Sequence, residues 1–191
     1  MARDDPADAL MVTLASPWGP VQVAASASGI CGAELRSSPA AFARAVGRRI
    51  GRPVTGEPLD APAEAGALLA SARVELLRAF AGEPSAVADV ALDWRGIPAW
   101  DRRVLEGARL IKHGQATSYG RLARRIGAPG AARAVGSAMG RNPFWIFVPC
   151  HRVVAGDGTI GGYGGGDDAL EIKRDLLALE GTVPPITGLL D

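Results

Sequence analysis

The 191-residue sequence has few cysteines, few aromatic residues and no long apolar segment. Two cysteines, Cys31 and Cys150, are too few for a disulfide scaffold of this size, so we expect free thiols in a reducing compartment, the cytoplasm. No apolar run approaches the roughly 20 residues of a membrane-spanning helix, and we expect no membrane association. Residues 1–14 carry three aspartates and no apolar core, which argues against a signal peptide. Hydrophobic residues still make up 48% of the chain, enough to bury a core and to exclude a disordered protein.

Acidic residues are almost absent from residues 102–152. This segment holds ten basic residues and one acidic residue, Glu106, so its net charge of +9 leaves −8 on the rest of the chain. Such segregation predicts a polyanionic partner for the basic segment. The alternative interpretation is a composition rich in alanine and arginine, with the arginines simply solvated.

Hydrophobic periodicity and turn residues predict a mixed α/β chain whose two parts meet near residues 93–99. The predicted strands are residues 11–14, 21–25, 30–35 and 87–92. The predicted helices are residues 40–50, 63–80, 97–111, 117–127 and 131–139. The first three strands form an antiparallel meander because short turn clusters separate them. Ser38-Pro39 is typical of the start of the first helix.

The last two predicted helices are short and are separated by a turn that contains glycine, which is a helix-turn-helix pattern. Many helical hairpins share this pattern without binding anything. Its position inside the basic segment strengthens the pattern as a candidate binding motif for a polyanion.

Cys150 is the candidate nucleophile. The apolar run 146–148 leads into Pro149-Cys150-His151-Arg152, and cationic neighbours favour the thiolate form of a cysteine. A free cysteine is more often an inert apolar residue, which is the interpretation that we adopt for Cys31 in its β-run. The cysteines and histidines form no C-x2-4-C or H-x3-5-H pair, so we expect no metal and no cofactor.

The sequence Pro149-Cys150-His151-Arg152-Val153-Val154, preceded by Asn142-Pro143, resembles the active-site signature of the O6-alkylguanine-DNA alkyltransferases. Further segments are similar to other parts of that family in the same order, so the resemblance covers nearly the whole chain. These segments are residues 16–32, 114–123, 131–136 and 176–181.

The resemblance implies a two-domain α/β protein. Residues 10–93 would form a small α/β domain with an antiparallel, ribonuclease H-like sheet. Residues 94–184 would form a mainly helical, winged-helix-like domain that contains the helix-turn-helix. The expected partner is double-stranded DNA containing O6-alkylguanine, bound through the minor groove by a monomer.

The resemblance also implies a single-turnover repair enzyme. Cys150 would take the alkyl group irreversibly from O6-alkylguanine, with O4-alkylthymine as an additional candidate substrate. His151 would remove the thiol proton through water, Glu180 would orient His151, and Asn142 would brace the turn. The target base must leave the helix stack, and Arg133 would fill the space that it vacates.

The remaining implied residues contact the DNA or form the pocket. Further DNA contacts are expected from Tyr119, Thr117, Ser118, Arg141 and Arg152, and Tyr119 would also protonate N3 of the leaving guanine. The substrate pocket is expected to contain Met139, Trp145, Val153, Tyr163 and Gly164. The chain departs from the family pattern at Phe144-Trp145, where small residues or proline are usual, and in a longer loop after Tyr163. The indole of Trp145 is expected to narrow the pocket and to disfavour bulky alkyl groups.

Two other functions are compatible with the scaffold. Relatives that lack the nucleophile recognise alkylated DNA as a flag, and Cys150 argues against that function here. A dealkylase or alkyl acceptor for a small molecule would leave the basic segment and Arg133 without a role.

Overall fold

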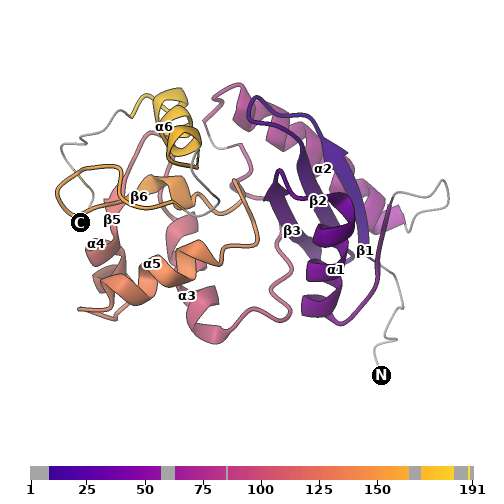
Figure 1. The fold of residues 1–191 in the computed structure, drawn as a ribbon, viewed down its shortest axis with the longest axis horizontal. Helices are drawn as coiled ribbons and strands as arrows, with labels where there is room; N and C mark the ends of the chain where they lie inside the picture. The colour runs from indigo at the N-terminus through magenta and orange to yellow at the C-terminus, as the bar shows by residue number, and fades with distance from the viewer. Residues whose placement is uncertain (1–8, 57–62, 85, 164–168, 183–188, 190–191) are drawn as a thin grey trace.

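The computed structural model describes residues 9–56, 63–84, 86–163, 169–182 and 189, which form a mixed α/β fold (Figure 1). The strands are β1 (Ala9–Leu14), β2 (Val21–Ser26), β3 (Gly29–Leu35), β4 (Val54–Gly56), β5 (Thr117–Ser118) and β6 (Val153–Val154). The helices are α1 (Pro39–Ile50), α2 (Ala63–Phe80), α3 (Ala99–Arg109), α4 (Tyr119–Arg125), α5 (Ala132–Gly140) and α6 (Ala169–Leu179), with a 3-10 turn, η1 (Cys150–Arg152). No helix in these described ranges is long and apolar enough to cross a membrane.

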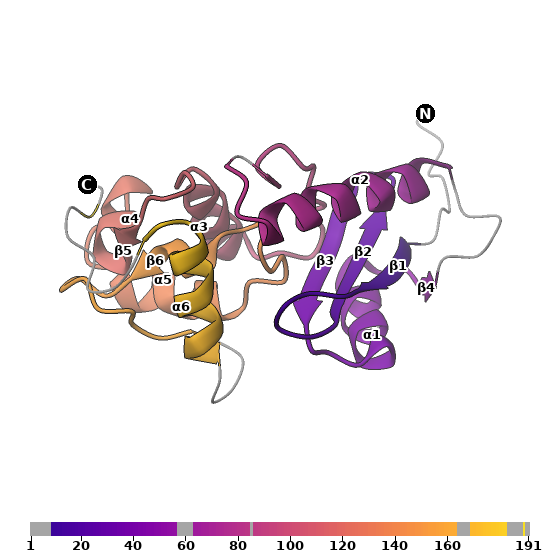
Figure 2. The ribbon, with the colours of Figure 1, turned by 90° about the horizontal axis from the view of Figure 1, so that it is seen from above.

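A four-stranded sheet of order β3-β2-β1-β4 lies between α1 and α2 (Figure 2). The predicted meander is confirmed, because β1, β2 and β3 pair antiparallel. The sheet as a whole is mixed, since β4 pairs with β1 in parallel, so the prediction of an antiparallel sheet is wrong at this edge. Alternate residues of β1 face opposite layers: Leu10 packs with the core on the α2 side, and Met11 with the cluster on the α1 side.

The start and end of α1 follow from its sequence, as predicted. The Ser38 hydroxyl accepts a hydrogen bond from the Ala41 amide at 3.3 Å, and Pro39 occupies the first turn. Gly51 ends the helix with a φ of 71°. The buried face of the helix consists of Phe42, Val46 and Ile50.

The predicted strand at residues 87–92 is wrong. Residues 86–89 form turns, and Val87 has a φ of 60°, which is unfavourable for a β-branched residue. The end of the segment runs along the free edge of β3 instead. The Ile30 amide donates to the Ala91 carbonyl, and the Asp93 amide donates to the Ile30 carbonyl, both at 2.8 Å.

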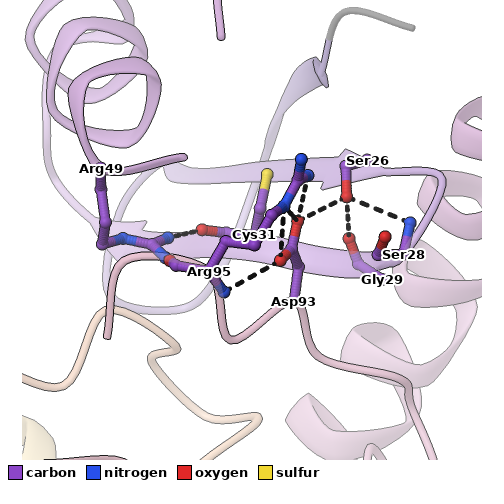
Figure 3. Close-up of polar contacts among 7 residues, drawn as sticks. All are labelled: Ser26, Ser28, Gly29, Cys31, Arg49, Asp93 and Arg95. Carbon is purple, nitrogen blue, oxygen red and sulfur yellow. Dashed lines mark hydrogen bonds and ion pairs between the residues drawn. The ribbon is translucent and has the colours of Figure 1, made fainter. Parts of the chain in front are cut away.

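Residues 91–98 form a linker that leads from the edge of β3 to α3. A polar cluster joins this linker to the sheet (Figure 3). Asp93 is buried, forms an ion pair with Arg95 and accepts a hydrogen bond from the Ser26 hydroxyl at 2.7 Å. Burial would raise the pKa of Asp93, but hydrogen bonds from Arg95 and Ser26 lower it below its ordinary value. Arg49 of α1 donates to the carbonyls of Cys31 and Arg95, so one guanidinium joins helix, sheet and linker.

The second half of the chain contains α3 to α6 and a small parallel sheet, β5-β6 (Figure 1). The two predicted short helices are present as α4 and α5, joined by a turn in which Gly127 and Gly130 have φ values of 69° and 86°. The first of them starts at Tyr119, two residues later than predicted. Thr117 and Ser118 are instead strand residues, because they pair with Val153 and Val154.

Gly96 tests how closely the linker packs on α1. It has a φ of 70°, and a Cβ at this position would clash with the carbonyl oxygen of Arg49. Gly51 is a matched control, because its φ is 71° but a Cβ there would meet nothing within 4 Å. We expect Gly51→Ala to lower the free energy of unfolding by about 1 kcal/mol, the cost of a left-handed backbone. Gly96→Ala should lower it by roughly 2–4 kcal/mol because the clash adds to that cost. Thermal unfolding measures both, and equal losses would show that the linker has room to move away.

Candidate active site

The segment that carries the predicted nucleophile is held in a tight turn. The Asn142 side chain closes this turn, donating from Nδ2 to the Val148 carbonyl at 3.1 Å and accepting at Oδ1 from the Phe144 amide at 3.0 Å. Inside the turn, Ile146 has a φ of 69°, an unfavourable conformation that the surrounding bonds must maintain. The turn leads into η1, which begins at Cys150.

The same turn is attached to the edge of β3. The Ala33 amide donates to the Pro143 carbonyl at 2.8 Å, and the Trp145 amide donates to the Ala33 carbonyl at 3.0 Å. Phe144 is fully buried and packs edge-on against Trp94, with ring centroids 5.2 Å apart. The first half of the chain therefore positions the backbone of the active-site segment directly.

The two cysteines occupy different environments. Cys150 is 9% exposed and lines a cleft, and its Sγ lies 3.7 Å from Tyr163 Oη. Cys31 is fully buried in the cluster between the sheet and α1. Burial, together with the charge of Asp93, raises the pKa of Cys31 to about 12, so that residue stays a thiol at neutral pH. Of the two cysteines, only Cys150 can meet a substrate.

His151 and Glu180 form a buried pair. His151 is 2% exposed, and its Nε2 lies 2.8 Å from Glu180 Oε1. Burial lowers the pKa of His151 even though Glu180 opposes this, so the ring is neutral at pH 7. A neutral ring beside a carboxylate carries its proton on Nε2. Among the described residues, Nδ1 has no hydrogen-bond partner, which leaves a bare acceptor nitrogen beside the nucleophile in sequence.

Arg152 completes this cluster and does not lie with the exposed arginines. Its Nε and Nη2 donate to Glu180 at 2.9 and 2.8 Å, and its Nη1 donates to the Ile111 carbonyl at 2.6 Å. Burial would raise the pKa of Glu180, but hydrogen bonds from His151 and Arg152 lower it to about 2. The predicted DNA contact of Arg152 is therefore corrected: its side chain is 13% exposed and holds Glu180 in place.

The other predicted DNA contacts differ in how exposed they are and in the partners that they already have. Thr117 is fully buried. Ser118 is 5% exposed, and its hydroxyl is already engaged in capping α4, where it accepts from the Arg121 amide at 3.2 Å. Arg141 is exposed, but it forms a two-point ion pair with Asp101 at 2.7 and 2.8 Å.

A cleft of about 1090 Å³ leads to Cys150. One side consists of residues from α4 and α5, and the other includes Glu34 and Arg36 at the end of β3. The predicted residues in its walls are Asn142, Ser118, Tyr119, Arg133, Met139, Trp145, Cys150 and Tyr163. Arg133 is exposed on the first turn of α5. Val153 is fully buried and is not among the lining residues, and Gly164, like the rest of the loop 164–168, lies outside the described residues.

Lys173 is a site residue that the sequence reasoning missed. It is fully buried, and its Nζ donates to the carbonyls of Val153 at 2.7 Å and Gly162 at 3.0 Å. The same atom lies 5.8 and 5.6 Å from the ring centroids of Tyr119 and Tyr163. Burial lowers the pKa of Lys173 to about 8. The sequence does contain a signal for this burial, because Lys173 falls at the helical spacing of the apolar residues of α6.

The sequence matches the family described as "6-O-methylguanine DNA methyltransferase, DNA binding domain" over residues 99–182. A methylated-DNA–protein-cysteine methyltransferase from Mycolicibacterium paratuberculosis is 52% identical over 101 residues, which are 53% of this chain and 58% of that protein. The chain thus aligns with little more than half of that relative. A protein of the same name from Mycobacterium bovis is 49% identical over 116 residues, covering 60% of this chain and 67% of the relative.

Solved structures extend the similarity to most of the chain. The crystal structure of Mycobacterium tuberculosis O6-methylguanine methyltransferase has a TM-score of 0.70 and 35% identity, covering 90% of this chain and 92% of that one. Mycobacterium tuberculosis OGT in complex with DNA has a TM-score of 0.71 and 36% identity, covering 92% and 96%. The mixed α/β fold is therefore shared along nearly the whole length of these proteins.

The buried Glu180 carboxylate predicts a pH-dependent stability. Its pKa of about 2 in the folded protein lies below the unfolded value of about 4.3, so it stabilises the fold above pH 4.3, and this contribution disappears as pH falls towards 2. We expect Glu180→Gln to lower the free energy of unfolding by roughly 3 kcal/mol at pH 7, with the difference from wild type shrinking between about pH 5 and 2. Denaturant unfolding at several pH values measures this.

Glu106→Gln is the matched control for Glu180→Gln. Glu106 also pairs with an arginine, Arg102, at 2.9 Å, but both side chains are exposed. We expect a change below about 1 kcal/mol at every pH. Equal effects of the two substitutions would contradict the buried cluster.

Proposed function

Because the chain belongs to the O6-methylguanine DNA methyltransferase family, we propose that it repairs DNA by moving the alkyl group of O6-alkylguanine irreversibly onto Cys150. O4-alkylthymine is proposed as an additional substrate. The observation that carries the proposal is the place of Cys150, which lies in the cleft between α4, α5 and the end of β3. It is followed directly by a neutral histidine tied to a carboxylate.

Activation of the thiol requires a base and a path for the proton. The bare Nδ1 of His151 is the proposed base, reached from Cys150 through one water molecule. Glu180 stabilises the imidazolium that forms, as the acid does in a hydrolase triad. The thiolate then attacks the alkyl carbon, the carbon–oxygen bond breaks, and a thioether remains on Cys150.

The leaving guanine needs a proton as its bond to the alkyl group breaks. Tyr119 is the proposed donor to N3. Its hydroxyl donates to the Gly162 carbonyl at 3.0 Å in the free protein, so it must exchange that bond for the base. Burial raises the pKa of Tyr119, which keeps the hydroxyl protonated until then. Lys173, which lies between Tyr119 and Tyr163, holds the Gly162 carbonyl from the other side.

DNA is proposed to lie along α5 with its minor groove facing the helix. The target base would rotate out of the stack into the cleft, which costs a few kcal/mol. Arg133 would occupy the space left behind, a role that suits its exposed position at the mouth of the cleft. Minor-groove binding suits repair because that groove carries little sequence information.

We also propose that residues 10–93 and 94–184 are two domains, the first ribonuclease H-like and the second winged-helix-like. The grouping of the four-stranded sheet with α1 and α2 at one side of the molecule, and of α3 to α6 at the other, supports this division (Figure 2). The protein would act as a monomer in the cytoplasm, a reducing compartment in which Cys150 stays available.

One alkyl group should transfer to each chain. With a duplex that contains O6-methylguanine, intact-mass spectrometry should show the addition of one methyl group, and peptide mapping should place it on Cys150. Cys150→Ser should abolish transfer while DNA binding remains. Cys31→Ala, the matched control at the buried cysteine, should leave transfer unchanged. Repeated turnover, or methylation at Cys31, would refute the proposed function.

Arg133 should matter mainly in duplex DNA. We expect Arg133→Ala to slow methyl transfer from a duplex by roughly tenfold or more, but transfer from a single strand by much less, because an unpaired base costs less to extrude. Arg102→Ala is the control, since Arg102 is exposed but paired with Glu106. Single-turnover rates on both substrates measure this. Equal slowing on the duplex and on the single strand would show that Arg133 acts only as a phosphate contact.

Trp145 should restrict the size of the alkyl group. Its indole lines the cleft, and close-packed walls do not contract to admit a bulky ligand. Methyl should therefore transfer much faster than benzyl, and Trp145→Ala should narrow that ratio by raising the benzyl rate. The comparison needs single-turnover rates with matched methyl and benzyl oligonucleotides. An unchanged ratio would mean that Trp145 does not limit the pocket.

A further inference from the structure

The hydroxyl of Tyr163 lies between the indole of Trp145 and the thiol of Cys150. The proposed mechanism gives this hydroxyl no role. Trp145 Nε1 is 3.2 Å from Tyr163 Oη, and Cys150 Sγ is 3.7 Å from the same oxygen. All three side chains line the cleft. Trp145 also belongs to one of the segments at which the sequence departs from the pattern that the resemblance implies.

The donor and acceptor capacities of these groups fix the direction of the hydrogen bonds. An indole N–H can only donate, so the Tyr163 oxygen accepts from Trp145. In the thiol form Cys150 Sγ also donates to this oxygen. The hydroxyl proton of Tyr163 is free to be donated, and no other acceptor for it is found among the described residues. A thiolate can only accept. Once Cys150 has lost its proton, the Tyr163 hydroxyl is therefore the donor in the contact between them.

The neighbours of Trp145 hold its indole in place. Its ring packs edge-on against Trp18, with centroids 6.0 Å apart, and lies 6.3 Å from Phe80. Its backbone amide donates to Ala33 on β3. The indole N–H is thus held at the cleft by packed aromatic rings and by the backbone contact of the turn with β3.

The ionisable groups that face Cys150 come from several elements. Tyr119 of α4, Lys173 of α6 and Tyr163, in the segment before α6, interact electrostatically with Cys150, and His151 is its neighbour in η1. Burial, together with the charge of Cys150, raises the pKa of Tyr163 well above its ordinary value, so its hydroxyl remains protonated while the thiol ionises. Lys173 is 5.6 Å from the Tyr163 ring centroid, but its amino group already donates to two carbonyls.

We infer that Tyr163 stabilises the Cys150 thiolate by donating its hydroxyl hydrogen bond to Sγ, and that the Trp145 N–H is the positioning group that aims this hydroxyl. The inference deepens the proposed function, on which it rests for the identity of the alkyl donor. The thiol proton goes to His151, and Tyr163 keeps its own proton throughout. Its bond to the sulfur weakens as the thioether forms, because the sulfur then loses its charge.

The test is the pH profile of thiol reactivity, which requires no DNA. Iodoacetamide alkylates the thiolate, so its rate against pH, with peptide mapping to Cys150, gives a pH midpoint for wild type and variants. Tyr163→Phe removes only the hydroxyl and should raise the midpoint by about 1 pH unit, the size expected for one hydrogen bond to a charged group. Trp145→Phe keeps an aromatic ring in the wall and should raise the midpoint by about half as much.

Trp18→Phe is the matched control for Trp145→Phe. It removes an indole N–H from the same aromatic cluster, but that N–H donates to Asp175 Oδ2 at 2.9 Å and not to Tyr163. Its midpoint should equal that of wild type. A midpoint that stays constant or falls in both Tyr163→Phe and Trp145→Phe would overturn the inference, since the thiol would then be the donor. Shifted midpoints without methyl transfer from DNA would instead overturn the proposed function and leave the network intact.

Discussion

The carboxylate of Glu180 is the group on which the rest of the active site depends. It accepts hydrogen bonds from His151 and Arg152 and, at 3.2 Å, from the Gly114 amide. Arg152 in turn holds the Ile111 carbonyl just beyond the end of α3. One buried charge therefore joins α3, η1 and the end of α6. Loss of Glu180 or of Arg152 would leave the other ion without its partner.

The same carboxylate determines which nitrogen of His151 can act as a base. A neutral ring that donates from Nε2 to Glu180 must present an unprotonated Nδ1. The edge of β3 fixes the other half of the geometry, because the Trp145 backbone pairs with Ala33 and its indole forms a cleft wall. The nucleophile thus lies between a charge cluster in the second half of the chain and a strand edge in the first half.

The sequence predicted those helices and strands that are determined by residues close together in the chain. The Ser38-Pro39 cap, the meander and the two short helices follow from turn residues and apolar spacing, and they are present in the fold. Residues 87–92 looked like a strand because most of them are apolar, but residues 86–89 form turns and only the end of the segment runs along the edge of β3. The three residues of β4 are too few to show a periodic pattern. They form a strand because they pair with β1, which is distant in the chain.

The candidate site shows the same division. The resemblance pointed to the Cys150, His151 and Glu180 cluster and to the Asn142 turn, which the structure brings together. It could not show that Arg152 turns inward to Glu180, because sequence does not reveal which arginines find buried partners. The contacts of Lys173 with Val153 and of Trp145 with Tyr163 join residues that are distant in the chain, so only the fold reveals them.

The protonation state of His151 decides whether Nδ1 can serve as the base for Cys150. The sequence has two histidines, so long-range proton–nitrogen NMR spectra of the labelled protein, with a His113→Asn variant for assignment, resolve the ring nitrogens of His151. At pH 7 we expect a neutral ring with the proton on Nε2 and an unprotonated Nδ1, and this state should persist below pH 6.5 because burial lowers the pKa of His151. A ring protonated on both nitrogens, or on Nδ1 alone, would contradict this expectation, because Nδ1 could then not take the proton of Cys150.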